Sequence, residues 1–291
     1  MLYVLCTSKP SDGLLHYSYE YTHKLNEAGM ETKCLFFPSE GFTKQDYIDA
    51  INNKYRVYDH VMFDDEIVTV WDHDGCFILN RSMVTLPYHN RKKYTEKQRF
   101  ILSELCNKLI STYSTNHPEQ AYQAALMYFN ANYVVDICDK EVYNDGVGEN
   151  FEKRINFSLY KDIVHEPVCE HLFLGTNREY YDTVLGQYEN YADPAVIVYE
   201  NQKGLEVFRH DLKHIYVPVD NLCGLFEKYV YTKTAFDPAP RLLQECKYYG
   251  KELIYARDPS MVDGGSVYYK RDLKEPDLTA VFNAIDILKR K

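Results

Sequence analysis

The first 37 residues most constrain the fold class, because their pattern predicts a β-strand, an α-helix and a second β-strand. Residues 2–6 form a short apolar run of the kind found in buried parallel strands. After a polar loop, the pattern over 14–28 predicts a helix that Gly29 ends. The next apolar run, 32–37, predicts a second strand. This βαβ unit is the basic building block of a doubly wound α/β sheet.

The same alternation continues along the chain. Further strands are predicted at 57–63, 67–71, 77–79, 171–174, 195–199, 215–218, 228–231 and 252–255, and helices at 96–113, 119–130, 179–188, 241–249 and 278–289. A polar, turn-rich stretch at 144–150 predicts a linker or a long loop. Because 291 residues are long for one hydrophobic core, we expect two α/β domains.

Charge and composition narrow the class of partner. The formal net charge of −10 argues against a protein that binds nucleic acid over its whole surface. The basic residues 91–93 could form a local DNA-binding groove, although such a run is also typical of a solvated loop. The 28 tyrosines offer rings that stack on bases or sugars, or they reflect a coding bias.

The cysteines and the apolar runs indicate the compartment. None of the eight cysteines has the two-residue spacing of a zinc knuckle or a redox motif. No signal peptide is recognisable, and no apolar run reaches the length of a membrane span. We therefore expect a cytoplasmic protein with reduced thiols and no membrane partner.

The most informative segment is 236–246, where the chain leaves a strand, turns at two prolines and enters a helix. Pro240 suits the first helical position, and the free backbone donors at that end can receive a diphosphate. Arg241 can add a bidentate contact to phosphate. Glu245 lies one turn later on the same face, where its carboxylate can accept both hydroxyls of a ribose. An ordinary helix start in an α/β fold is the alternative.

This segment, with the Gly-Lys pair at 250–251 and the strand that follows, resembles the donor half of GT-B glycosyltransferases. The resemblance implies two Rossmann-like domains that face each other across a cleft. Residues 1–165 would form the N-terminal acceptor-binding domain and 166–275 the C-terminal nucleotide-sugar-binding domain. A C-terminal helix within 276–291 would pack back on the first domain.

The resemblance also implies roles for individual residues. Glu245 would bind the ribose, while Arg241 and the turn at Pro240 would serve the phosphates. A second phosphate loop would contain Gly175, Asn177 and Arg178. The common family pattern has a further acid eight residues before the glutamate. Asp237 occupies that position here, so only a shortened variant is present.

Three residues are candidates for the general base that takes the proton of an acceptor hydroxyl. Asp72 and Asp74 flank a histidine in an Asp-x-Asp triplet, which holds a metal in GT-A transferases. Because the donor motif belongs to a metal-independent fold, we expect no metal and assign these acids to base catalysis. His16, one turn before Glu20, is the alternative base. Solvated loop acids and a surface or capping histidine are the structural alternatives, and a retaining transfer needs no base.

The predicted activity is transfer of a sugar from a UDP-sugar to a hydroxyl acceptor, with no permanently bound cofactor. The small size and the Tyr-rich and Asn-rich character resemble phage-encoded transferases that add glucose or arabinose to hydroxymethylcytosine. The favoured acceptor is therefore a 5-hydroxymethyl-pyrimidine in double-stranded DNA, in the host cytoplasm if the chain is phage-encoded. A saccharide or glycan acceptor, or a non-catalytic nucleotide- or sugar-binding module, is the alternative. The sugar, the stereochemical outcome and the oligomeric state stay open.

Overall fold

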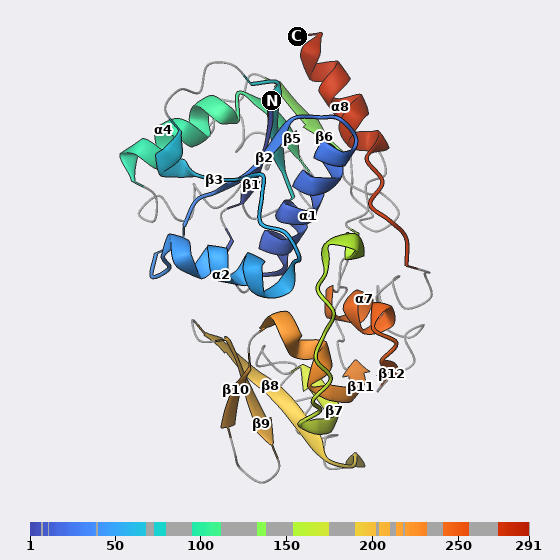
Figure 1. Cartoon of the computed structure of the whole chain (residues 1–291). Helices are drawn as coiled ribbons and strands as arrows, with labels where there is room; N and C mark the ends of the chain where they lie inside the picture. Colours follow the sequence, from blue (N-terminus) through green and yellow to red (C-terminus); the bar gives the residue numbers. More distant parts are fainter. Residues whose placement is uncertain are drawn as a thin grey trace. The chain divides into compact units, whose positions relative to one another are not determined.

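The chain contains two compact units, whose elements are drawn in Figure 1. The first comprises Met1–Asn52, Val57–Leu159 and Glu275–Lys291, and the second comprises Asn53–Arg56 and Tyr160–Lys274. The computed structural model describes residues 1–6, 8–10, 12–38, 40–67, 73–79, 95–111, 133–137, 154–174, 190–201, 204–209, 214–217, 219–231, 241–255 and 273–290.

The first unit is built on a six-stranded sheet in the order β3-β2-β1-β4-β5-β6. Its strands are β1 (Leu2–Cys6), β2 (Thr32–Phe36), β3 (Val61–Phe63), β4 (Gly75–Ile78), β5 (Lys108–Ser111) and β6 (Tyr133–Asp136). Every neighbouring pair is parallel. This is the strand order of the doubly wound Rossmann sheet, and the order reverses direction between β1 and β4. The predicted α/β class is confirmed.

Side-chain caps mark the starts of two helices of the first unit. The helices of this unit are α1 (Gly13–Glu27), α2 (Lys44–Lys54, whose last two residues belong to the second unit), α4 (Glu96–Leu105) and α8 (Thr279–Lys289). Asp12 caps α1 by accepting a hydrogen bond from the Leu14 amide at 3.0 Å. Thr95 and Gln98 form a reciprocal capping box at the start of α4. Helix α1 packs on β1 and β2, and α8 packs on β5 and β6.

Tyrosine is a core residue in this unit. Tyr19, Tyr21 and Tyr47 are fully buried. Each hydroxyl nevertheless has a backbone partner, as a buried phenol requires. Tyr19 donates to the Val57 carbonyl at 2.7 Å, Tyr47 donates to the Ser8 carbonyl at 3.0 Å, and Tyr21 accepts from a backbone amide at 3.2 Å. These tyrosines fill the core and fix loops, so they are not the free stacking surfaces that the composition suggests.

The second unit is built on another six-stranded sheet, in the order β10-β9-β8-β7-β11-β12. Its strands are β7 (Cys169–Leu174), β8 (Pro194–Asn201), β9 (Gly204–Arg209), β10 (His214–Val217), β11 (Phe226–Tyr231) and β12 (Glu252–Tyr255). Strands β8, β7, β11 and β12 are parallel, and β9 and β10 extend them in antiparallel fashion. Helix α7 (Arg241–Tyr248) connects β11 to β12. Strand order reverses direction between β7 and β11.

Two helices differ from the sequence prediction, and the strands β6 and β9 were not predicted. The predicted helix at 96–113 ends as α4 at Leu105, and the strand β5 begins three residues later. Sheet pairing overrides the helical pattern there, because Leu109 and Ile110 lie between β4 and β6. Helix α2 was not predicted. The predicted strand at 67–71 falls mostly, and the predicted helices at 119–130 and 179–188 fall wholly, outside the described residues.

The cysteines in the described part of the chain are all buried and free. Burial raises the pKa of the Cys6 thiol to about 12, so this thiol stays protonated at neutral pH. Among the helices described, none combines the length and the apolar character that crossing a membrane requires.

Gly75, the first residue of β4, gives a test of this packing. Its φ is +148°, and an added Cβ would lie 3.2 Å from the Lys108 carbonyl oxygen and 3.4 Å from Leu288 Cδ1. We expect Gly75→Ala to lower the free energy of unfolding by about 2–4 kcal/mol, through backbone strain and crowding together. Urea unfolding measures the loss.

The matched control is Gly29→Ala, at the end of α1. Gly29 has a φ of +86° but no atom within 4 Å of an added Cβ. This variant measures the backbone strain of a left-handed position without crowding, which costs about 1–2 kcal/mol. Equal losses in the two variants would show that the close approach of β4, β5 and α8 does not restrict Gly75.

Candidate functional site

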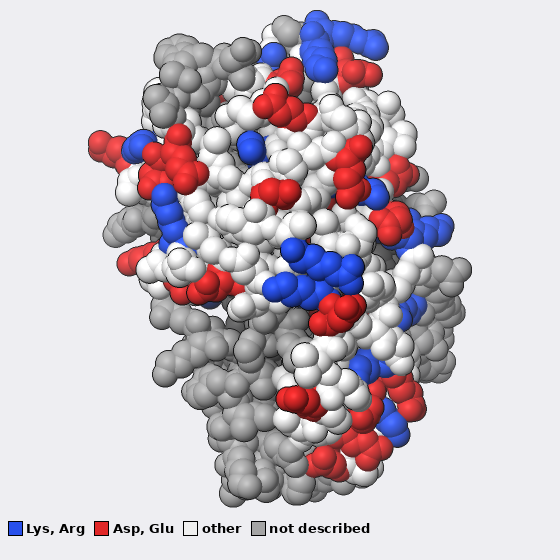
Figure 2. All heavy atoms as spheres, viewed as in Figure 1, with Lys and Arg blue, Asp and Glu red and all other residues white. Residues whose placement is uncertain are grey.

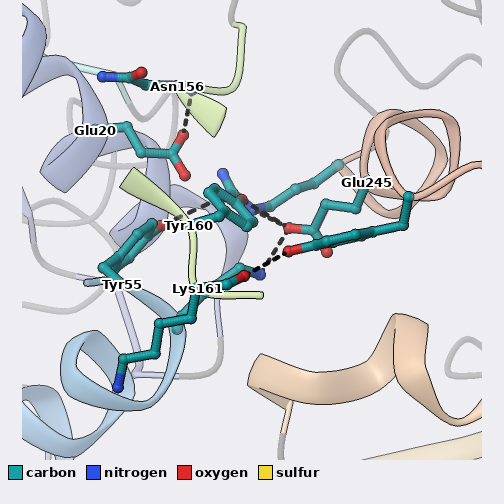
Figure 3. A network of polar contacts seen from close by, with 9 residues as sticks. Glu20, Tyr55, Asn156, Tyr160, Lys161 and Glu245 are labelled. Atoms are coloured by element: carbon teal, nitrogen blue, oxygen red, sulfur yellow. Dashed lines mark hydrogen bonds and ion pairs between the residues drawn. The ribbon is translucent and has the colours of Figure 1, made fainter. Parts of the chain in front are cut away.

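A cluster of charged side chains in the second unit surrounds the carboxylate of Glu245 on α7 (Figure 3). Its Oε1 accepts three hydrogen bonds. The donors are Lys54 Nζ at 2.7 Å, Arg241 Nε at 2.9 Å and the Tyr160 hydroxyl at 3.0 Å. Arg241 and Glu245 are four residues apart, so they share one face of α7. The other carboxylate oxygen, Oε2, takes none of these three bonds.

Pairing of two distant segments brings Lys54 to this carboxylate. Tyr55 and Tyr160 form an antiparallel β-bridge, and the Lys161 amide donates to the Lys54 carbonyl at 3.0 Å. The two tyrosine rings meet edge to face, with centroids 5.3 Å apart. Lys54 Nζ also lies 5.2 Å from the centre of the Tyr160 ring, within cation–π range. The bridge therefore positions both the cation and one hydroxyl donor.

Arg241, the first residue of α7, is held by the same tyrosines. Its Nη2 donates to the Tyr160 hydroxyl and, at 3.4 Å, to the Tyr55 hydroxyl. The Tyr160 hydroxyl thus accepts from Arg241 while it donates to Glu245. Only 11% of the Arg241 side chain is exposed. The guanidinium is therefore fixed in direction before any ligand arrives.

The cluster buries two cations beside one carboxylate. Lys54 is 3% exposed and Glu245 8%, so both charges are largely removed from water. Burial raises the pKa of Glu245, but the charges of Lys54 and Arg241 and the hydrogen bonds to the carboxylate outweigh burial and lower the pKa overall. Two cations therefore face one carboxylate, an arrangement that suits an anionic ligand.

The fold puts these charges at the edge of the sheet where ligands bind. Helix α7 follows β11, and strand order reverses direction between β11 and β7. In open α/β sheets, ligands bind outside the carboxyl ends of the strands at such a switch point. The rest of the predicted donor site lies outside the described residues: Gly175, Asn177, Arg178, Asp237 and Pro240.

His16 occupies the equivalent edge of the first unit. It lies in the first turn of α1, which follows β1, and β1 is the strand beside the switch point at β4. The side chain is buried. Glu20, one turn later, is also buried and accepts a hydrogen bond from the Asn156 amide at 3.3 Å, as Figure 3 shows. The place of His16 agrees with a catalytic role, which stays a prediction.

Asp74 lies at the opposite edge of that sheet. It directly precedes β4, and its Oδ2 accepts a hydrogen bond from the amino group of Met1 at 2.8 Å. Strands β1 and β4 are parallel with Leu2 beside Gly75, so Asp74 is at their amino ends. Ligands in such sheets bind at the carboxyl ends. The geometry therefore gives Asp74 no support as a base, and Asp72 lies outside the described residues.

The face of the molecule drawn in Figure 2 does not single out a nucleic-acid groove among the described residues. On the face drawn in Figure 2, acidic and basic side chains are interspersed. The basic residues 91–93, on which the DNA hypothesis depends, lie outside the described residues.

Substitution of Glu245 tests the buried cluster. We expect Glu245→Gln to lower the free energy of unfolding by about 3–5 kcal/mol, because two buried cations lose their counter-charge. Lys54→Met costs less, since Arg241 still neutralises the carboxylate. The matched control is Asp162→Asn, which breaks the exposed 3.0 Å ion pair with Arg56 and costs at most about 1 kcal/mol. Equal losses in the free energy of unfolding for Asp162→Asn and Glu245→Gln, measured with urea, would contradict this account.

The same carboxylate predicts a pH dependence. Because the pKa of Glu245 is lowered in the folded state, its ionisation stabilises the fold at pH values above the unfolded pKa of about 4.3. This contribution is lost as the pH falls from there through the folded pKa. We expect the wild-type free energy of unfolding to fall more steeply below about pH 5 than that of Glu245→Gln. Parallel curves in urea series at several pH values would contradict the expectation.

Comparisons with known proteins identify no family. No protein-family model matches the chain, and no curated protein does so either. Among solved structures, the chain is similar to the crystal structure of SsfS6, a glycosyltransferase from Streptomyces sp. SF2575. The match covers 99% of this chain and 94% of that one, at 11% identity and a TM-score of 0.35. A likeness at this level does not establish a shared fold.

Proposed function

We propose that the chain is a glycosyltransferase that moves a sugar from a nucleotide sugar, in particular a UDP-sugar, to a hydroxyl acceptor. The observation that carries the proposal is the pair of buried cations, Lys54 and Arg241, that Glu245 holds beside the switch point of the second sheet. A diphosphate matches their charge, and the free amides of a helix start add donors for it.

The contacts of Glu245 support a double role for this residue. Its Oε1 holds Lys54, Arg241 and Tyr160, whereas Oε2 takes none of those bonds and is the oxygen available to ribose hydroxyls. In this arrangement the carboxylate stays ionised and fixed whether or not a nucleotide is bound. The loop with Gly175, Asn177 and Arg178 is proposed to hold the phosphates from the other side.

The proposed reaction is a displacement at the anomeric carbon of the sugar. The acceptor oxygen bonds to that carbon, the bond from the carbon to the diphosphate oxygen breaks, and UDP leaves. Arg241 and the helix amides stabilise the negative charge that develops on the diphosphate. In an inverting transfer a base takes the hydroxyl proton. We assign this role to His16, because its position at the carboxyl end of β1 favours it over Asp74.

The favoured acceptor is a 5-hydroxymethyl-pyrimidine in double-stranded DNA, with the base flipped out of the stack to reach the enzyme. This choice rests on the resemblance to phage-encoded transferases. The formal charge of −10 favours the competing acceptor, a saccharide or glycan, which carries no polyanionic backbone. The test of turnover separates the two.

Calorimetric titration with UDP, without magnesium, tests the donor site. We expect a dissociation constant of micromolar order and at least a tenfold weaker one for Arg241→Gln, which is about 1.4 kcal/mol. The control is Arg56→Gln, which removes an exposed, ion-paired arginine from the same unit and leaves the affinity unchanged. Near-UV circular dichroism confirms that each variant is folded.

Two results would overturn the donor site: no UDP binding by the wild-type chain, or equal binding by Arg241→Gln. Binding only in the presence of magnesium would contradict the metal-independent assignment and return Asp72 to consideration as a ligand.

Turnover is measured by incubating the chain with a panel of UDP-sugars and either hydroxymethylated duplex DNA or oligosaccharides. Mass analysis of the digested nucleosides or glycans identifies the product. We expect His16→Ala to lower the rate by about 10²–10⁴-fold while UDP affinity stays unchanged. UDP binding without turnover on any acceptor would indicate a non-catalytic nucleotide-binding module.

A further inference from the structure

Two histidines and one aspartate converge at the surface of the first unit, outside the cluster around Glu245. His23 belongs to α1, and Asp59 and His60 directly precede β3. His23 Nε2 lies 2.7 Å from Asp59 Oδ1, and His60 Nε2 lies 3.7 Å from Asp59 Oδ2. One ligand atom from each residue lies within 4.8 Å of the others. Neither the donor site nor the proposed base uses these side chains.

The ring nitrogen Nε2 of His23 is buried without a hydrogen bond. The side chain is only 7% exposed. Asp59 Oδ1 makes an ion-pair contact with Nε2 at 2.7 Å, but no hydrogen bond satisfies the ring nitrogen. A buried polar atom that lacks a hydrogen bond destabilises the fold and calls for an explanation. A metal ion bound by both the ring nitrogen and the carboxylate supplies one.

The surrounding backbone holds the three residues in place. His60 has a φ of +54°, a left-handed conformation that is unfavourable for most residues other than glycine. Its carbonyl is fixed by the Cys34 amide at 2.7 Å. The His23 ring meets the rings of Tyr19 and His60 edge to face, with centroids 4.6 and 5.1 Å apart. Strain kept in such a defined setting is typical of functional sites.

We propose that His23, Asp59 and His60 form a binding site for zinc or a similar divalent transition metal. Two imidazoles and one carboxylate are ligands that such ions prefer, and three protein ligands leave a fourth position for water. Bonds of about 2.0–2.1 Å place tetrahedral ligands about 3.3 Å apart. His23 Nε2 and Asp59 Oδ1, now 2.7 Å apart, must therefore separate by roughly half an ångström when the ion binds. Asp59 is exposed and His60 half-buried, so an ion can enter from solvent.

This site does not depend on the proposed glycosyl transfer. A metal here is bound by the first unit alone, and UDP titration neither supports nor opposes it. The competing account is an ordinary His–Asp pair that binds no metal. The two accounts differ in stoichiometric metal binding, which is measured directly.

The experiment uses the whole chain without an affinity tag, stripped of metal by a chelator and then dialysed. Zinc is titrated in competition with a chromophoric chelator. We expect one zinc per chain at this site, with a dissociation constant of micromolar order or tighter. Asp59→Asn keeps the side-chain size and His60→Asn tolerates the positive φ, so both are expected to fold. Each should weaken binding at least tenfold.

The matched control is His165→Ala. His165 is an exposed histidine 3.1 Å from the carboxylate of Glu227, so it reproduces a His–carboxylate pair without a second imidazole. We expect this variant to bind zinc as the wild type does. Cobalt(II) gives a second readout, because tetrahedral coordination produces strong visible absorption that His60→Asn should abolish. Zinc should also raise the melting temperature of the wild type but not of Asp59→Asn.

Two outcomes overturn the proposal. One is the absence of saturable zinc binding by the stripped wild-type chain. The other is binding that Asp59→Asn and His60→Asn leave unchanged, which would place the ion on other residues.

Discussion

Burial of the Glu245 carboxylate is the constraint on which the second unit depends. A negative charge that has left water persists only where cations and hydrogen bonds replace its hydration. Arg241 alone comes from the same helix, and Lys54 and Tyr160 come from two other segments. Residues 53–56, which carry Lys54, join the second unit through the β-bridge between Tyr55 and Tyr160. The two cations that neutralise Glu245 are also the feature that we propose to suit a diphosphate.

Much of the fold follows from apolar runs that the sequence shows openly. Strands β1, β2 and β12 were predicted because each is a short apolar segment next to a polar or glycine-containing turn. The boundary between α4 and β5 was missed because no glycine or proline marks the turn at Cys106 and Asn107. Helix α2 was missed because it is mostly polar.

Within the candidate sites, residues that are close in sequence could be predicted to lie together, and residues that are far apart could not. Arg241 and Glu245 were predicted to lie together because both sit on one helix with known geometry. Lys54 reads as an ordinary solvated lysine until the β-bridge places it beside Glu245. The metal-site role of His23 was not predicted either, because His23 meets Asp59 only when α1 packs beside the residues that precede β3. Contacts of this kind are products of topology, which local sequence does not encode.

The path of the chain has a consequence for how the protein matures during synthesis. The sheet of the first unit is translated before most of the second unit, yet α8, which packs on β5 and β6, comes after it. Until α8 leaves the ribosome, that part of the first sheet lacks its covering helix, while all segments of the second unit have already been made. The unit that begins to be translated first is therefore the last to receive all of its segments, because Glu275–Lys291 follow the whole of the second unit in the chain.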